Sequence, residues 1–542
     1  MKIMKINTKW FLATIIIASS AIFSCKNPLT DFNLLVSSEV IRQSTTIKIV
    51  DQNGANIAGV QVELESGDTK DVYNLSGVRD FKVNDNLVTF GLDPKRVPTV
   101  ESPVRFRIKI SAPGYISQIV PVTISSVSQG LQTAVLTKPS EVTEGVEEVK
   151  QNIALQTDGS TVAAQTVIVP SAVGKGEINI VIPAGTQFKD ASGQTLTGNF
   201  MQLSVTSIDA DNEDAVVLLP GNGLRTDKVV GTSGQNTSGA FKPAAVVEIK
   251  MTINAIVVKE FNKPIQVSIP VDGDYRMATD NKPIAAGATL QLYSYSSDNL
   301  WRREQDTQVS GNTNDGFRSN LTISHLSHFL VGEFGESCPT DREVRFTGNW
   351  MTNDLVYPIT VEYFWGDQLL GEAQFSISNN ANNIAIANIP KAGSKIIVKT
   401  SSGSFLAEQQ LNACGEVSSM ILPNPNDASN PVSTLQLFVR CPDKTDPITI
   451  LPTFHMFYRL AGTSEYKFLG TVSNGFLRTS LLKTDGTTYD FKAIWNDRVK
   501  VVHNKTIQKD NTATVGIKPG DIIGSKDGAT NLEILTEECG KL

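Results

Sequence analysis

The sequence is poor in the side chains from which catalytic and metal sites are most often built. Its 542 residues include 4 histidines and 5 cysteines. The H-E-x-x-H pattern of zinc hydrolases is absent, and so is the G-x-S-x-G elbow of serine hydrolases, which the run Gly231-Thr232-Ser233-Gly234-Gln235 does not match. No two cysteines have the C-x-x-C spacing of zinc and redox sites. These absences predict a chain without enzymatic activity.

Charge and aromatic content are also modest. Lys and Arg number 48 against 55 for Asp and Glu, so the net charge is −7, and 7% of the residues are aromatic. Nucleic-acid binding requires concentrated positive charge, which this slightly acidic chain lacks. We therefore expect no nucleic-acid partner.

The N-terminus has the composition of an export signal. Lys2, Lys5 and Lys9 are followed by an uncharged, mostly apolar run from Trp10 to Phe23. This run is shorter than the roughly 20 residues that a helix needs to cross a bilayer. A basic leader followed by a short apolar stretch is typical of a secretory signal.

The end of this run, Ile22-Phe23-Ser24-Cys25, resembles the lipobox of bacterial lipoproteins. The resemblance implies cleavage before Cys25 and a diacylglycerol on its thiol, with residues 1–24 as signal peptide and 25–43 as a polar tether. Two or more acyl chains hold a protein stably on a membrane, at about 0.8 kcal/mol per buried methylene. The expected location is the bacterial outer membrane or cell surface. The alternative is an ordinary signal peptide with a chance cysteine.

The other four cysteines suggest disulfides. They are Cys338, Cys414, Cys441 and Cys539, and an even number in an exported chain favours pairing. Three pairings are possible. We expect Cys338–Cys414 and Cys441–Cys539, because each pair would bracket one candidate module.

Period-two hydrophobicity dominates the sequence and predicts strands rather than helices. Between Val104 and Ile110, apolar side chains alternate with Arg105, Arg107 and Lys109. Such alternation indicates half-buried strands of antiparallel sheets. No amphipathic helix longer than two turns is recognisable. The predicted fold class is all-β, with tandem antiparallel β-sandwich modules behind the N-terminal signal helix, at residues 44–140, 151–336, 337–422 and 432–542.

The first module carries a recognisable turn pattern. It reads D-x-x-G-x-x-I-x-G-V-x-V from Asp51 to Val62, and Ala112-Pro113-Gly114-Tyr115 precedes its last strands. This pattern resembles the carboxypeptidase-regulatory-like (transthyretin-like) sandwich. The resemblance implies a stalk or binding module without catalytic residues.

The second module has landmarks of a different kind. These are Ile182-Pro183-Ala184-Gly185-Thr186, Phe261-Asn262-Lys263-Pro264 and the closing run His325-Leu326-Ser327-His328-Phe329. They are similar to those of ZU5-type modules, some of which cleave themselves at a His-Phe-Ser site. Since no His-Phe-Ser run occurs here, we expect a closing strand packed into the core.

The last two modules share signals that suggest distant copies. Cys338-Pro339 and Cys441-Pro442 stand early, and Leu370-Gly371 and Leu469-Gly470 follow aromatic strands. The Pro- and Asn-rich segment 422–427 between them is typical of a linker.

Two sets of residues are candidates for binding. Asp209, Asp211 and Asp214 crowd one loop and could hold Ca²⁺, and no other cofactor is expected. The loop lacks the EF-hand pattern, so a solvated turn is the favoured interpretation. Trp350, Trp365 and Trp495 could stack on carbohydrate or on another surface protein, and the alternative is that they anchor cores.

The function predicted from the sequence is therefore presentation rather than catalysis. The expected protein is a lipid-anchored surface structural or adhesion protein that displays β-sandwich binding modules. An alternative is a glycan-binding accessory lipoprotein of an outer-membrane uptake system, which an exposed row of tryptophans would favour. A third hypothesis is an autoprocessing or hydrolytic surface protein.

Overall fold

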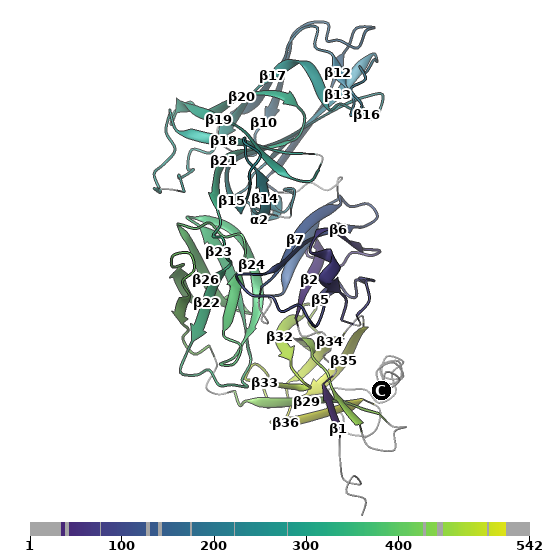
Figure 1. Ribbon diagram of the computed structural model, residues 1–542, viewed down its shortest axis with the longest axis vertical. Coiled ribbons are helices and arrows are strands. Elements are labelled where there is room, and N and C mark those ends of the chain that lie inside the picture. Colours follow the sequence, from purple (N-terminus) through teal and green to yellow (C-terminus); the bar gives the residue numbers. More distant parts are fainter. Residues whose placement is uncertain are drawn as a thin grey trace, which may run out of the picture. The chain divides into compact units, whose positions relative to one another are not determined.

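The structure is a computed structural model, and it is built almost entirely of strands (Figure 1). It describes residues 34–37, 43–75, 77–125, 130–138, 144–173, 176–221, 223–278, 280–296, 298–425, 430–441, 448–495 and 498–515. Within these residues the helical elements are one 3-10 turn, η1 (Thr69–Asp71), and one short helix, α2 (Glu213–Val216). No helix in these ranges is long and apolar enough to cross a membrane. The predicted all-β fold class is confirmed, while the predicted signal helix and Cys25 lie outside the described residues.

The chain divides into two compact units. Residues 41–426 form one unit, and residues 427–542 form the other together with residues 1–40. The larger unit contains three modules, at residues 44–138, 146–336 and 337–422, and the smaller contains the fourth.

The first module is a sandwich of two sheets with the orders β4-β5-β2-β8 and β3-β6-β7 (Figure 1). Its core includes Phe90, Phe106 and Ile108, at most 2% exposed, which are the apolar positions of alternating strands. Pairing is antiparallel except that the first strand pairs parallel with the last. Its strands are β2 (Ser44–Asp51), β3 (Gln61–Gly67), β4 (Val72–Tyr73), β5 (Leu87–Leu92), β6 (Val104–Ser111), β7 (Gln118–Ile124) and β8 (Gln132–Leu136).

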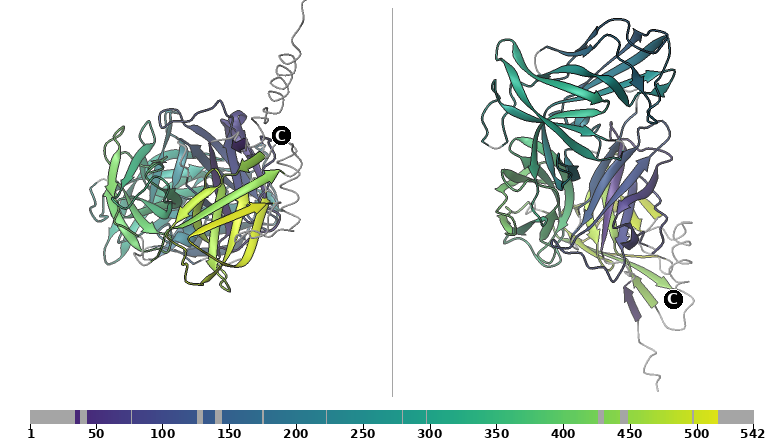
Figure 2. Two further views of the ribbon diagram at one scale, coloured as in Figure 1. Left: turned by 90° about the horizontal axis from the view of Figure 1, so that it is seen from below. Right: turned by 45° about the horizontal axis from the view of Figure 1, so that its top comes forward.

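The second module is larger and has two layers of strands, seen in Figure 2 in blue to teal. One long strand, β19, pairs with β18 through its first part and with β20 through its last part, and so passes from one layer to the other. One continuous core lies between the layers. The strands are β9 (Val146–Ala154), β10 (Gln165–Pro170), β11 (Glu177–Ile182), β12 (Phe188–Lys189), β13 (Phe200–Ile208), β14 (Arg225–Val230), β15 (Asn236–Ile253), β16 (Ile256–Val257), β17 (Glu260–Val271), β18 (Thr289–Tyr295), β19 (Trp301–Asn312), β20 (Gly316–His325) and β21 (His328–Glu336).

The third module is a sandwich closed by a disulfide. Its sheets have the orders β24-β23-β26-β27 and β25-β22-β28, and β22 pairs antiparallel with β25 and parallel with β28. Cys338 and Cys414 are bonded, which confirms the first predicted pair. Its strands are β22 (Arg342–Thr347), β23 (Tyr357–Trp365), β24 (Gln368–Ile377), β25 (Asn383–Ile386), β26 (Ser394–Thr400), β27 (Phe405–Gln410) and β28 (Ser418–Ile421).

The fourth module repeats this topology. Its sheet β32-β31-β34-β35 corresponds to β24-β23-β26-β27, and β29 pairs antiparallel with β33 and parallel with β36. Cys539 and the side chain of Cys441 lie outside the described residues, so the second disulfide stays a prediction. The strands are β29 (Ser433–Cys441), β30 (Ile448–Leu451), β31 (Phe454–Leu460), β32 (Lys467–Val472), β33 (Phe476–Thr479), β34 (Thr488–Trp495), β35 (Arg498–Thr506) and β36 (Asp510–Val515).

The Leu-Gly signal shared by these two modules has a structural cause. Leu370 and Leu469 are buried, and the glycine after each leucine has a left-handed backbone, with φ of 131° at Gly371 and 145° at Gly470. Each glycine stands at a register shift in the hairpin that follows the aromatic strand. Only glycine adopts such angles readily, so both copies keep it.

The predicted tether contains one further strand. β1 (Leu34–Ser37) pairs parallel with β30, from Leu34 opposite Ile448 to Ser37 opposite Leu451. The prediction of a tether over the whole of 25–43 is therefore wrong for these four residues. The outer edge of β30 would otherwise leave backbone groups unpaired, and a Leu-Leu-Val run has the propensity to pair with it.

Candidate functional site

The surfaces where modules of the larger unit meet carry charged side chains that alternation alone would assign to solvent. Arg107 of β6, in the first module, forms an ion pair with Asp227 of β14, in the second. The Arg107 Nη2 and Nε donate to Asp227 at 2.7 and 3.1 Å, and its Nη1 donates to the Asn299 carbonyl at 3.0 Å. The two side chains are 12% and 19% exposed. This bidentate geometry is the strongest form of an ion pair between side chains.

The first and third modules are joined in two ways. Arg105 Nη2 lies 2.8 Å from Asp341 Oδ1, and the Asp341 side chain is 2% exposed. Burial raises the pKa of Asp341, and the Arg105 charge opposes that effect. Leu131 and Gln374 exchange two backbone hydrogen bonds of 2.8 and 3.1 Å. Leu131 of the first module thus pairs with the edge strand β24 of the third.

The second and third modules share a buried charge network. Lys242, only 3% exposed, forms an ion pair with Asp367 and lies 5.3 Å from the centre of the Tyr275 ring. The Tyr275 hydroxyl donates to Glu333 Oε2 at 3.0 Å, and the Ala278 N–H donates to the same oxygen at 2.6 Å. Burial and the Glu333 charge raise the pKa of Tyr275, so this hydroxyl keeps its proton.

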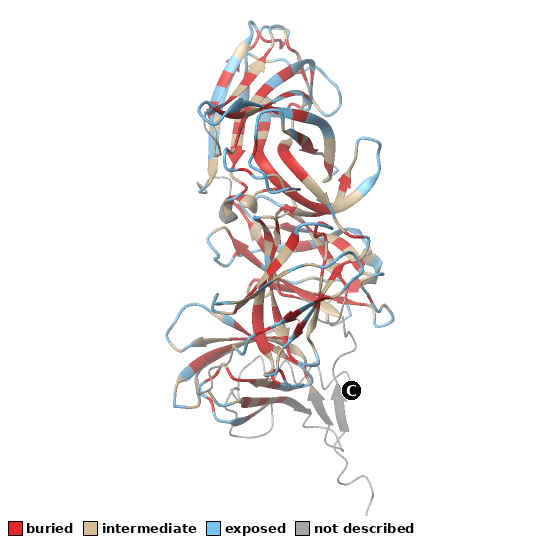
Figure 3. Ribbon diagram, turned by 90° about the vertical axis from the view of Figure 1, so that its left-hand side faces the viewer, coloured by how far each residue is buried: buried red, intermediate tan, exposed pale blue. Residues whose placement is uncertain are grey.

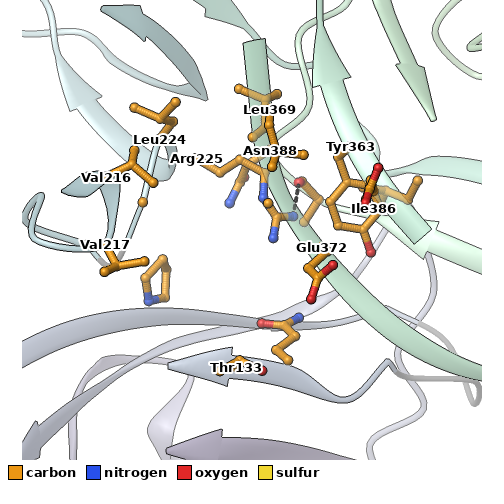
Figure 4. A pocket seen from close by; sticks show the side chains of 18 of the residues that line it. Thr133, Val216, Val217, Leu224, Arg225, Tyr363, Leu369, Glu372, Ile386 and Asn388 are labelled. Atoms are coloured by element: carbon orange, nitrogen blue, oxygen red, sulfur yellow. Dashed lines mark hydrogen bonds between the residues drawn. The ribbon is translucent and has the colours of Figure 1, made fainter. Parts of the chain in front are cut away.

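A cavity of about 380 Å³ lies among these three modules, and we take it as the candidate functional site (Figure 4). It is lined by side chains from β8 of the first module, from α2 to β14 of the second, and from β23 to β25 of the third. The volume falls within the range of small-molecule sites. Figure 4 shows Arg225, Asn388 and Glu372 on one side, together with the aliphatic Leu369 and Ile386. On the other side are Val216, Val217 and Leu224.

Arg225 is the cationic residue that lines this cavity. It begins β14, and its guanidinium lies over the Tyr363 ring at 4.8 Å from the ring centre. Its Nη1 donates to the Ala387 carbonyl at 3.4 Å. Among the described residues no carboxylate lies within ion-pair distance of it. Burial lowers the pKa of Arg225, but an arginine stays charged.

Asn388 and Tyr363 complete this wall. Asn388, 9% exposed, has a left-handed backbone with φ of 58°. Its side chain makes no hydrogen bond within the part of the chain that the structure describes. Tyr363 is 3% exposed, and burial raises its pKa to about 12. Among the described residues, the cavity therefore presents the charge of Arg225 and the amide of Asn388 beside the carboxylates of Glu362 and Glu372.

The loop predicted as a calcium candidate forms a turn that starts α2. Asp209 Oδ1 accepts the Asp211 N–H at 3.0 Å, and Asn212 Oδ1 accepts the Ala215 N–H at 3.2 Å. Burial, and then the charges of Asp209 and Asp272, raise the pKa of Asp211. The Asp214 side chain is not described. The described residues contain no cluster of three His, Cys, Asp or Glu that could hold a metal. Since the Asp214 side chain lies outside them, calcium binding and a solvated turn both stay predictions for this loop.

The predicted sugar contacts of the tryptophans need correction where their side chains are described. Trp365 is 5% exposed and packs beside Gly335 and Gly393, so it offers no ring face to a sugar. Trp350 is half-buried, and its Nε1 donates to the Leu422 carbonyl at 3.0 Å. The Trp495 side chain lies outside the described residues. The core-anchor alternative holds for Trp365.

The His-Ser segment of the second module has a structural role. The Ser327 hydroxyl accepts the Tyr295 N–H at 2.8 Å and lies 2.7 Å from the Tyr295 carbonyl, to which it can donate. His328 Nε2 lies 2.8 Å from Glu248 Oε1. Ser327 thus joins two strands, as expected of a closing strand packed into the core.

The pair formed by His328 and Glu248 makes the stability of the second module dependent on pH. Burial raises the pKa of Glu248, but the hydrogen bond and charge of His328, with the charge of Lys250, outweigh it and lower the pKa from 4.5 to about 2. Folding then favours the carboxylate, so the stabilisation is complete above pH 4.5 and is lost as the pH falls from there toward 2. Between pH 6 and pH 3, the free energy of unfolding measured in urea should fall more for the wild type than for Glu248→Gln.

The exposed Glu148 provides a matched control for this measurement. It pairs with Lys150, and its side chain is 40% exposed. Glu148→Gln should retain the wild-type pH dependence. Equal pH slopes for wild type and Glu248→Gln would contradict the assignment.

Comparison with known proteins adds little. No family model matches the chain, and no curated protein matches it. Among solved structures, the Bacillus anthracis TIE protein is 10% identical over 70% of this chain and 76% of that chain, with a TM-score of 0.13. The N-terminal four Ig domains of Dscam1 isoform 8.4 are 10% identical over 87% of this chain and 98% of that chain, with a TM-score of 0.08. These scores establish no common fold.

Proposed function

We propose that this chain is a non-catalytic, lipid-anchored surface protein that presents the unit of residues 41–426 for binding or adhesion. The observation that carries the proposal is the set of ion pairs between its modules. Arg107–Asp227 and Lys242–Asp367 each join two modules through at least one largely buried side chain. Breaking such pairs leaves an uncompensated charge, so the three modules are expected to behave as one body.

The pairing of β1 suggests which part is presented. In the proposed protein the acylated Cys25 is nine residues from Leu34, a span of at most about 32 Å. Since β1 belongs to the sheet of the fourth module, that module would be held near the membrane. None of the described strands of the larger unit belongs to that sheet, and we take this unit as the part presented for binding.

The family resemblances of residues 44–140 and 151–336 belong to the same proposal. A transthyretin-like module and a ZU5-like module would both serve as spacers or binding modules. The glycan-binding alternative receives no support from Trp365, because that side chain is buried.

Cell fractionation tests this proposal. Wild type should sediment with the outer membrane, whereas Cys25→Ser should lose its acyl chains and leave roughly a tenth or less in that fraction. In a second arm, a cysteine introduced at the exposed Ala191 should react with a membrane-impermeant maleimide on intact cells.

Unsubstituted protein is the control for that labelling. Retention of Cys25→Ser in the membrane would refute the anchor. Labelling of Ala191→Cys only after lysis would refute presentation at the surface.

A further inference from the structure

The cavity among the three modules has binding capacity that the protein itself does not use. The Arg225 guanidinium carries five N–H donors, and only the bond to the Ala387 carbonyl is found among the described residues. Its other contact is the Tyr363 ring, whose centre lies 4.8 Å from the guanidinium carbon and which uses none of its N–H donors. A guanidinium with free donors can bind a carboxylate through two parallel N–H···O hydrogen bonds.

Asn388 provides a second, independent indication of a ligand. Asn388 is 9% exposed and lines the cavity, and its side chain makes no hydrogen bond to the described residues. The amide is not among the buried side-chain groups without a partner, so it is accessible in the cavity, where a ligand can bind it in place of solvent. The backbone at Asn388 is left-handed, a conformation that asparagine tolerates.

The other charges of the wall restrict the class of ligand. Asp211, Glu362 and Glu372 also line the cavity, and Glu362 is paired with Lys399. A dianion such as phosphate would meet more carboxylates than cations. A zwitterionic ligand, with one carboxylate and one ammonium group, would match both the cation and the carboxylates of the cavity. Glu372 can accept a hydrogen bond from the ammonium group in addition to its other interactions, because a carboxylate accepts several hydrogen bonds.

The opposite wall selects for an apolar group. Val216, Val217 and Leu224 face the polar side chains across the cavity (Figure 4). Aliphatic carbon placed there would leave water at about 25 cal/mol per Å² of buried area.

We propose that this cavity binds a small zwitterion of the free amino acid type. Its carboxylate would lie on Arg225 and Asn388, its ammonium group toward Glu372, and its aliphatic side chain against Val216, Val217 and Leu224. The inference rests on the proposed function in one respect, since it supplies a ligand for the presented unit. It concerns residues 41–426 alone and does not depend on the anchor.

Isothermal titration calorimetry of the chain from residue 27 onward tests the proposal. Leucine is the zwitterionic probe, 4-methylpentanoate has its carboxylate without the amine, and leucinamide has its amine without the carboxylate. Leucine should bind at least about tenfold more tightly than either analogue. No heat with leucine, serine or phenylalanine up to about 10 mM would overturn the proposal, and so would equal binding of 4-methylpentanoate.

Three variants separate binding from folding. Arg225→Met should weaken leucine binding about 10- to 100-fold, and Asn388→Ala, which removes one neutral partner, about 5- to 10-fold. Arg276→Met, at an exposed arginine outside the cavity, should bind like wild type. Undiminished binding by folded Arg225→Met would overturn the assignment. Loss of membrane association by Cys25→Ser bears only on the proposed function, so the two can fail separately.

Discussion

Replacing both Cys338 and Cys414 by alanine should lower the free energy of unfolding of the third module by several kcal/mol. The disulfide closes a loop with a sequence separation of 76 residues. In the chain-entropy treatment, removing a cross-link over such a loop costs about 4–5 kcal/mol, because the unfolded chain regains its freedom. Urea unfolding of the double variant should show a lower midpoint with the slope little changed, unless the denatured state expands.

The double variant removes this disulfide alone, whereas a reducing agent would also reduce any other disulfide. Peptide mass mapping after thiol alkylation should show no modification at Cys338 and Cys414 in the unreduced wild type. A double variant that unfolds within about 1 kcal/mol of wild type would show that the bond contributes little to stability.

Arg107→Met should have the second large effect, because it removes one partner of the ion pair between the first two modules. The Asp227 side chain is only 19% exposed, and in the variant it would lack the guanidinium that neutralises it. The Asn299 carbonyl would also lose a charged donor. Breaking a buried pair from one side costs about 3 kcal/mol or more. Calorimetry should show the first module unfolding at a lower temperature, in a transition separated from that of the second.

The exposed pair Lys150–Glu148 supplies the comparison. Its side chains are 58% and 40% exposed, and pairs of this kind contribute less than about 1 kcal/mol. Lys150→Met should therefore leave the transitions unchanged. If Arg107→Met behaves like Lys150→Met, the modules are held together by other contacts.

Alternation of apolar residues was sufficient to predict strands, because the period of two is a local property of an extended chain. Val104, Phe106 and Ile108 are buried in β6, as their alternation predicts. The Cys338–Cys414 pair could also be predicted, since each cysteine stands at one end of a module. The shared Leu-Gly signal was read correctly as a repeat, and the structure adds its cause, a left-handed glycine at a hairpin bulge.

The polar face of β6 is not predictable from alternation. Arg105 and Arg107 alternate with core residues, and alternation assigns such positions to solvent. Both instead pair with carboxylates of other modules, at Asp341 and Asp227. Periodicity distinguishes the core side of a strand from the other side, but it does not tell whether the other side meets water or a second module.

The amino-acid sequence by itself predicted the all-β class, the alternating strand around Val104 to Ile110 and one disulfide, because each depends on neighbours along the chain or on the ends of one module. Only the tertiary structure decided that β1 joins the sheet of β30, and that Arg225, Asn388 and Glu372 line one cavity. The physical reason is distance along the chain. These residues are brought together by packing between modules, and no local period or motif records which surfaces will meet.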